Sequence, residues 1–294
     1  MATRMELFGE PRIRFSPPRS SFLKWVGNKH KMAAEITAYL PEVFGTLHDV
    51  FLGSGSILAT VSPASGVGSD TFAPLIEIWK TLQADPAEIK HWYAERWHTM
   101  AGAHDRVKAY EDIKASYNAN PNGADFLFLC RSCYGGVVRF RKADGYMSTP
   151  CGIHKPIPPE AFTRRADEWH ERTRHCTFML ADYTAAMQSA KPGDVVYCDP
   201  PYTHSQAILY GAQDFSLKRL LGVIDDCKRR GVRVMLSIDG TKRSGDTVCR
   251  LPIPRGLFER EIFIHVGRSM LKRFQMNGRS LEKEVVADRL LLTY

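Results

Sequence analysis

A carboxylate and an aromatic ring follow an apolar run in the segment "VVYCDPPY", which spans 195–202. The prolines lack a backbone donor and fix φ, so they end a strand and hold their neighbours in place. Asp199 and the carbonyl of Pro200 can accept the two N–H bonds of an exocyclic amino group, and Tyr202 can stack on its ring. The segment thus predicts a pocket for a flat heterocycle that carries an amino group. A surface turn is the alternative, which the apolar run disfavours.

A glycine turn predicts a second half of this site. The segment "DVFLGSGS" (49–56) ends a short apolar stretch on a Gly-x-Gly turn, whose backbone can approach a ligand closely. Leu58 stands where a dinucleotide fingerprint needs its third glycine. Asp70 ends the next apolar run, near the spacing at which an acid binds ribose hydroxyls, although it could also cap a helix. Together the turn and the acid favour a nucleoside-containing cofactor bound without a pyrophosphate loop.

The segment "FLKWVGNK" (22–29) adds a third set of polar and aromatic groups. Trp25 beside Gly27 can stack on a ligand, and Lys29 can supply a donor or a charge. On its own the segment indicates little, because a tryptophan is more often part of the core. Its role depends on the elements that bring it to the glycine turn.

Short apolar runs alternate with helical patterns in both halves of the chain, and two final runs have no helix between them. Such alternation predicts a doubly wound parallel α/β sheet with an antiparallel C-terminal hairpin. Ligands bind at the carboxyl ends of the strands in sheets of this kind, where Asp70, Asp182 and Asp199 are expected. The expected strands are 46–51, 65–70, 176–180, 193–198, 232–237, 261–266 and 284–294.

The composition changes at about Asp85, where the strand and helix alternation stops. The following segment predicts three helices, then a hairpin near 134–150 around the turn signal Asp144-Gly145, then a fourth helix. We therefore expect one domain made of 1–84 and 176–294, interrupted by a mainly helical domain at 85–175.

In this order along the chain, "FLKWVGNK", "FLGSGS", Asp70, "LADY" and "CDPPY" resemble the Dam-like DNA adenine-N6 methyltransferases of the alpha-type motif order. The resemblance covers nearly all of the chain from Phe22. It implies a Rossmann-like methyltransferase sheet, S-adenosylmethionine as cofactor, and methyl transfer to N6 of a flipped adenine in duplex DNA. The implied catalytic residues are Asp199, Pro200, Pro201 and Tyr202. The implied cofactor-binding residues are Trp25, Gly27, Lys29, Gly53, Ser54, Gly55, Asp70, Asp182 and Asp199.

The insert resembles the target-recognition hairpin of the same family, which follows the pattern L-N-R-x-x-Y-N-G-L-x-R. Here Cys130 and Gly135 replace its two asparagines, so the resemblance leaves the recognition sequence open. Arg139 could read guanine in the major groove or bind a phosphate. The implied DNA-binding residues are Lys24, Tyr134, Val137, Arg139 and Arg141.

Composition favours an anionic partner, because 40 Lys and Arg outnumber 32 Asp and Glu and give a net charge of +8. No run reaches the roughly 18 apolar residues of a membrane span, and no signal-peptide core is present. We expect a monomer in the cytoplasm of a bacterium, encoded by the host or a phage, with a cognate restriction endonuclease as a candidate partner.

The seven cysteines predict free thiols in a reducing compartment. The set Cys130, Cys133, Cys151 and His154 has the count and spacing of a structural zinc site. Cys130 ends the apolar run "ADFLFLC", however, and the family hairpin needs no metal. We therefore expect core thiols and no metal.

Two other functions remain open. The same pocket suits other amino groups, namely cytosine N4, adenine in RNA, or a protein glutamine. A DNA-binding homologue without catalytic activity is the second alternative, which the intact glycine turn and the intact "DPPY" disfavour.

Overall fold

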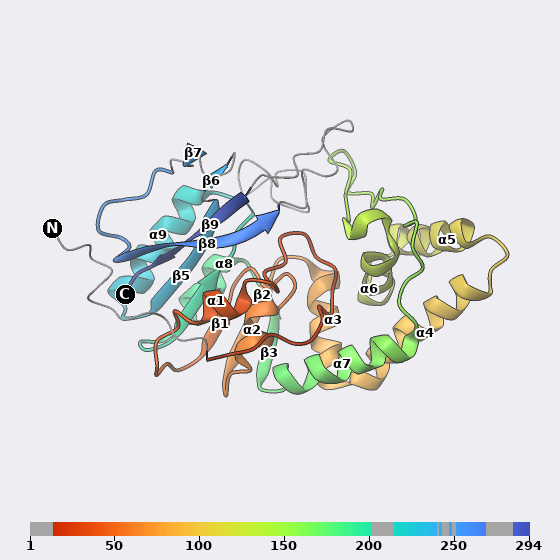
Figure 1. Cartoon of the computed structure of the whole chain (residues 1–294), viewed down its shortest axis with the longest axis horizontal. Helices are drawn as coiled ribbons and strands as arrows, with labels where there is room; N and C mark the ends of the chain where they lie inside the picture. Colours follow the sequence, from red (N-terminus) through yellow and green to blue (C-terminus); the bar gives the residue numbers. More distant parts are fainter. Residues whose placement is uncertain (1–13, 202–214, 240, 243–246, 249–250, 269–284) are drawn as a thin grey trace.

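The computed structural model describes residues 14–201, 215–239, 241–242, 247–248, 251–268 and 285–294. Its centre is a seven-stranded sheet in the order β3-β2-β1-β4-β5-β9-β8 (Figure 1). The first five strands in this order, β3, β2, β1, β4 and β5, are parallel. Strand β9 is antiparallel to both β5 and β8. The strands are β1 (Leu47–Asp49), β2 (Gly66–Asp70), β3 (Cys176–Leu180), β4 (Val195–Cys198), β5 (Arg233–Asp239), β8 (Arg260–Arg268), β9 (Val285–Leu292) and the separate pair β6 (Thr241–Lys242) and β7 (Thr247–Val248). The predicted fold class is confirmed.

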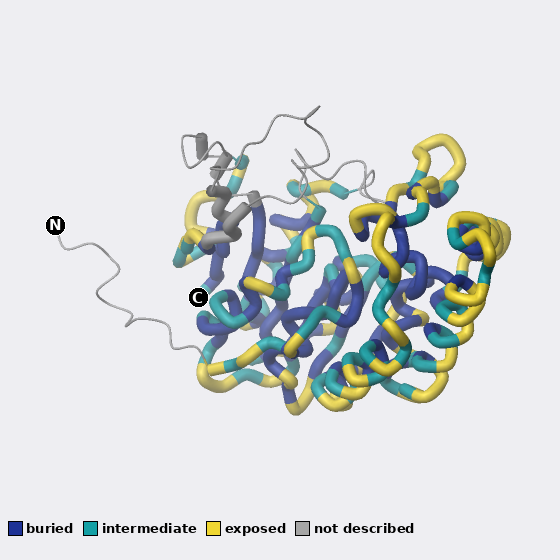
Figure 2. The backbone as a smooth tube through the Cα atoms, turned by 45° about the vertical axis from the view of Figure 1, so that its right-hand side comes forward, coloured by how far each residue is buried: buried dark blue, intermediate teal, exposed yellow. Residues whose placement is uncertain are grey.

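Helices cover both faces of the sheet, which explains why "VVYC" is apolar throughout. Val195 and Tyr197 belong to one hydrophobic cluster, with α1, α2 and α3, whereas Val196 and Cys198 belong to another, with α8 and α9. Figure 2 shows the buried strands between these layers. The Ser216 side chain caps α9. The covering helices are α1 (Ala33–Thr37), α2 (Ser56–Val61), α3 (Ala73–Ala84), α8 (Tyr183–Gln188) and α9 (Leu217–Arg229).

The strand order reverses direction at β1. From β1 the chain builds β2 and β3 on one side, whereas β4 and β5 lie on the other side. Such a switch point opens a crevice at the carboxyl ends of the strands. Asp49 ends β1 opposite Tyr197 of β4, so Asp49 and Asp199 reach the same crevice.

The segment between α3 and β3 forms helices beside the sheet (Figure 1). One hydrophobic cluster runs from α3 into α4, α6 and α7 without a break. The division into two domains therefore stays a prediction. The helices are α4 (Pro86–Gly102), α5 (Arg106–Ala119), α6 (Gly123–Ser132), the short 3₁₀ turn η2 (Tyr134–Gly136) and α7 (Pro159–Thr173).

The segment 134–150 folds back on itself, but its two extended runs form no strands. Two isolated antiparallel bridges join Cys133 to Cys151 and Phe140 to Met147. Gly145 adopts φ +68° at the turn that the Asp144-Gly145 signal marks.

Two further properties concern membranes and metals. Within the described part of the chain, no helix combines the length and apolar character needed to cross a membrane. The same residues contain no group of three His, Cys, Asp or Glu side chains placed to hold a metal ion. Cys130 is 0% exposed in the core, whereas His154 is exposed.

Candidate active site

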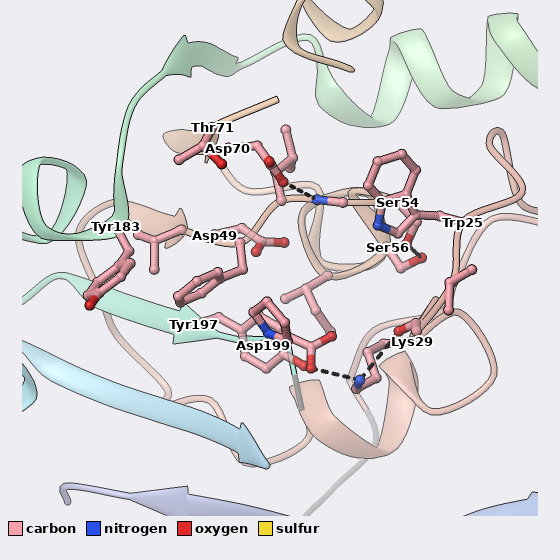
Figure 3. A pocket seen from close by; sticks show the side chains of 18 of the residues that line it. Trp25, Lys29, Asp49, Ser54, Ser56, Asp70, Thr71, Tyr183, Tyr197 and Asp199 are labelled. Atoms are coloured by element: carbon pink, nitrogen blue, oxygen red, sulfur yellow. Dashed lines mark hydrogen bonds and ion pairs between the residues drawn. The ribbon is translucent and has the colours of Figure 1, made fainter. Parts of the chain in front are cut away.

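A cavity of about 440 Å³ opens at the carboxyl ends of β1, β2 and β4. It brings together three segments that are far apart in the sequence (Figure 3). Gly55 and Pro200 do not line it, and Tyr202 lies outside the described residues. The expected site residues that line it are Trp25, Gly27, Lys29, Gly53, Ser54, Asp70, Asp182, Asp199 and Pro201.

Lys29 holds Asp199 at the wall of this cavity. Its Nζ lies 2.7 Å from Oδ1 of Asp199 and 3.7 Å from Oδ2 of Asp288, on β9. Lys29 is 5% exposed. Burial alone would lower the pKa of Lys29, but the carboxylates of Asp199 and Asp288 outweigh it and raise the pKa above its ordinary value. Lys29 therefore stays charged next to the first residue of "DPPY".

A small polar cluster fixes the segment that carries Trp25 and Lys29. Oδ1 of Asn28 accepts hydrogen bonds from the hydroxyls of Ser54 at 3.1 Å and Ser56 at 2.8 Å. These serines flank Gly55 in the glycine turn. The turn and the "KWVGNK" segment thus form one rigid wall of the cavity.

Gly53 is required where the turn meets Trp25. Its φ is +44°, and an added Cβ would lie 2.8 Å from Nε1 of Trp25. Its carbonyl accepts a 3.2 Å hydrogen bond from Nε1 of Trp79. Gly53 therefore contacts the indoles of both Trp25 and Trp79, and it also lines the cavity.

Gly55 packs away from the cavity, although the family resemblance placed it under the cofactor. Its φ is +63°, and an added Cβ would lie 2.8 Å from the ring of Trp79. Trp79 is 0% exposed and cannot move aside without opening the core.

We expect Gly55→Ala to lower the free energy of unfolding by about 1–3 kcal/mol, because it adds backbone strain and a clash. Urea denaturation followed by circular dichroism measures the change. Gly102→Ala is the matched control, since nothing lies within 4 Å of an added Cβ at the end of α4. There we expect no loss and a gain of up to about 1 kcal/mol. If the free energy of unfolding fell equally in both variants, the contact between Gly55 and Trp79 would not be tight.

Asp70 faces the cavity from the end of β2. Its Oδ2 accepts from the backbone N–H of Gly53 at 3.2 Å, and its Oδ1 accepts from that of Phe72 at 3.1 Å. Burial raises the pKa of Asp70, and these backbone donors oppose the rise in part. The second bond closes a local turn before α3, but the N-cap of α3 is Phe72 and carries no side-chain cap, so Asp70 does not cap this helix. The ribose-binding role of Asp70 stays a prediction.

Asp49 is a cavity residue that the sequence interpretation missed. It is 2% exposed, and among the described residues its Oδ1 is buried without a hydrogen-bond partner. Burial and then the charges of Asp199 and Asp70 raise the pKa of Asp49 well above its ordinary value. A cationic group of a ligand would satisfy this oxygen. Its position at a strand end, directly before the glycine turn, was the available signal.

An aromatic wall closes the far side of the cavity, and it too was missed. The rings of Phe51 and Tyr183 stack with centroids 5.2 Å apart, and Phe215 meets Phe51 edge to face at 6.0 Å. Asp182 lies beside them, where its side chain caps α8 and pairs with Arg219 at 3.2 Å. This wall suits a planar ring.

Comparison with known proteins shows which family the chain belongs to. A family model described as "D12 class N6 adenine-specific DNA methyltransferase" matches residues 25–250. The chain belongs to this family. Membership confirms the resemblance drawn from the motifs and places the protein in a class of enzymes.

Individual relatives support the family assignment. The chain is 28% identical over 230 residues to a DNA adenine methylase of Vibrio cholerae, covering 74% of this chain and 80% of that protein. It is 30% identical over 190 residues to the retron Ec67 DNA adenine methylase of Escherichia coli, covering 62% of this chain and 64% of the relative. It is 29% identical over 230 residues to a DNA N-6-adenine-methyltransferase of Escherichia phage P1, covering 75% of this chain but only 30% of the phage protein.

The residues of this family member that were expected to contact DNA differ in their exposure. The side chain of Lys24 lies against Gly136, where an added Cβ would be 2.8 Å from its Cδ. Tyr134 is 43% exposed, but Val137 is only 7% exposed and packs inward. Arg139 is exposed.

Arg141 is already engaged in the absence of DNA. Its guanidinium binds both carboxylate oxygens of Asp144 at 3.1 and 2.6 Å and lies 4.2 Å from the ring centre of Tyr146. The contact rigidifies the tip of the hairpin, so a DNA contact by Arg141 would compete with Asp144.

Proposed function

We propose that the protein transfers a methyl group from S-adenosylmethionine to N6 of an adenine in duplex DNA, with the base flipped into the cavity. The observation that carries this proposal is that one cavity joins the glycine turn and Asp70 to Asp199 and Pro201. A donor and an acceptor could therefore meet inside it. The family and its relatives support adenine and DNA as the target.

The residues of the cavity fit this cofactor. Asp49 offers a buried carboxylate oxygen to an ammonium group, and Asp70 offers its carboxylate to ribose hydroxyls. Gly53 lines the cavity without a side chain, and Phe51 with Tyr183 could bind the planar base. When bound, S-adenosylmethionine supplies a methyl group activated by a positively charged sulfur, so no metal is needed.

The chain's own groups would act on the target amino nitrogen. Flipping an adenine out of the duplex costs a few kcal/mol. A hydrogen bond to Asp199, which lines the cavity, would favour a pyramidal nitrogen whose lone pair is available. Lys29 fixes the Asp199 carboxylate through its 2.7 Å contact. Most of the rate would come from positioning and fixed charges, because the nitrogen becomes acidic only as it gains the methyl group.

Transfer of tritiated methyl groups tests this function. We expect label in unmethylated plasmid DNA, at the adenine N6, and none in RNA or protein. Label in cytosine, RNA or protein would favour the other amino targets. No label together with no heat of binding for S-adenosylmethionine would favour an inactive DNA-binding homologue.

Asp49→Asn is expected to weaken S-adenosylmethionine binding about 10- to 100-fold. The reason is that a hydrogen bond to a charged group contributes about 1.5–3 kcal/mol. The ligand-free variant should be no less stable than the parent, because burial and neighbouring acids already disfavour the Asp49 charge. Isothermal titration and urea denaturation measure the two quantities.

Asp194→Asn is the control, because it should change stability rather than cofactor affinity. Asp194 lies at the far end of β4 and accepts from Thr46 N at 2.8 Å, Lys191 N at 2.9 Å and His48 Nε2 at 3.0 Å. Its loss should lower stability and leave cofactor affinity unchanged. If Asp49→Asn kept full affinity, Asp49 would not be the ammonium site.

The proposal also covers the oligomeric state, the location and a candidate partner of the protein. We propose a monomer in a bacterial cytoplasm, with a cognate restriction endonuclease as a candidate partner. Modification-sensitive sequencing of DNA from cells that express the chain tests the specificity. A single methylated motif would identify the recognition sequence, whereas scattered methylated adenines would indicate relaxed specificity.

A further inference from the structure

We propose that Cys133 and Cys151 form a disulfide when the folded protein meets a small-molecule disulfide such as oxidised glutathione. The two residues lie at the base of the segment 134–150, where α6 ends and the chain returns from the hairpin. This is a modification site, and it does not depend on the proposed function.

The backbone places the two residues directly opposite each other. They form an antiparallel bridge. The bonds that flank it run from Tyr134 N to Pro150 O and from Gly152 N to Ser132 O, both at 2.8 Å. Cys133 and Cys151 are therefore a non-hydrogen-bonded pair, in which Cα atoms are about 4.5 Å apart and side chains share one face. Disulfides span Cα separations of about 4.4–6.8 Å.

Gly152 keeps the two segments in contact. An added Cβ there would lie 2.7 Å from the carbonyl oxygen of Ser132 and 2.9 Å from that of Cys133. Residues that lie directly opposite each other in such a pair project their side chains to the same face, so the two sulfurs lie on the same side of the bridge.

Exposure gives the order of reaction. Cys151 is half-buried, whereas Cys133 is 5% exposed. The thiolate of Cys151 would attack the small disulfide, form a mixed disulfide and release one small thiol. The thiolate of Cys133 would then attack the sulfur of Cys151, form the protein disulfide and release the second small thiol. The oxidant gains two electrons, and the protons of both cysteine thiols end on the two small thiols.

Cys130 is the competitor for Cys133. It lies three positions earlier in α6, and the Cys133 sulfur lies 3.9 Å from the Cys130 carbonyl oxygen. Cys130 is 0% exposed, so an external disulfide cannot reach it in the folded protein. Burial raises the pKa of all three thiols, so exposure, and not the pKa, separates Cys130 from Cys151.

Peptide mapping of the full chain tests the proposal. The native protein is treated with oxidised glutathione, alkylated, digested without reductant and analysed by mass spectrometry. We expect a linked peptide pair that contains Cys133 and Cys151, and its loss after treatment with dithiothreitol. The same treatment in urea should spread the pairing over the seven cysteines of the chain, because the native geometry is gone.

Three single variants separate the possibilities. Cys130→Ser should form the disulfide as the parent does. Cys133→Ser should stop at a glutathione adduct on Cys151, because the second thiol is missing. Cys151→Ser should give no bridge. A bridge between Cys130 and Cys133, or complete alkylation of Cys133 and Cys151 in the treated native parent, would overturn the proposal.

Discussion

Replacing Asp199 by alanine is expected to lower the rate of methyl transfer at least about 100-fold, on the scale of removing one group that stabilises developing charge. Binding of DNA and of S-adenosylmethionine should persist, because the glycine turn, Asp49 and Asp70 are untouched. Single-turnover transfer of tritiated methyl groups measures the rate at saturating cofactor. Fluorescence anisotropy and isothermal titration measure the two affinities.

The matched control is Asp167→Ala. Asp167 pairs with Lys90 at the surface of α7, and its side chain is 55% exposed. Its removal should leave the rate unchanged. A near-normal rate in Asp199→Ala would contradict the proposed role, whereas loss of both affinities would show that the variant disturbs the whole cavity.

The second large effect concerns stability. Lys29→Met should lower the free energy of unfolding by about 3–5 kcal/mol at neutral pH, because it leaves Asp199 and Asp288 buried without their shared cation. Lys90→Met, which breaks the surface pair with Asp167, should cost less than about 1 kcal/mol. Urea denaturation of both variants makes the comparison.

The pH dependence of this effect has a definite sign. The pKa of Lys29 is raised in the folded protein above its ordinary value of 10.5. The stability that the charged Lys29 contributes is therefore fully present below pH 10.5 and is lost as the pH rises through the raised pKa. Above neutral pH, the difference in free energy of unfolding between the parent and Lys29→Met should narrow in that alkaline range.

A double variant tests the three-residue arrangement directly. Adding Asp288→Asn to Lys29→Met removes one of the two carboxylates that lost this cation, so part of the lost stability should return. If Asp288→Asn instead lowers the free energy of unfolding of Lys29→Met by as much as it lowers that of the parent, Asp288 does not share the cation.

The sequence predicted the elements best where one short segment carried its own signal. The apolar run before Asp199 predicted a buried strand ending in a carboxylate, and the glycine turn predicted a close backbone approach. Both lie at the cavity. The local pattern could not show which side of a glycine faces the ligand, so the contact between Gly55 and Trp79 was not expected.

Residues brought in by topology were not predictable. Asp288 reaches Lys29 only because β9 enters the sheet antiparallel, between β5 and β8. Nothing near Asp288 in the sequence marks it, since one acid within an apolar strand is equally typical of a surface position. The segment 134–150 shows a similar limit, because its two runs form no strands and are joined by one isolated bridge, between Phe140 and Met147.

The acids around the cavity have a consequence for turnover. Asp49, Asp70 and Asp199 face a space lined by one ammonium group, that of Lys29, among the described residues. Such a cavity prefers a ligand with an additional positive charge over an otherwise identical neutral one. Methyl transfer removes the sulfonium charge, so we expect the spent cofactor to be held less tightly than the fresh one. The loss of this charge would then favour release of the spent cofactor before the next cycle.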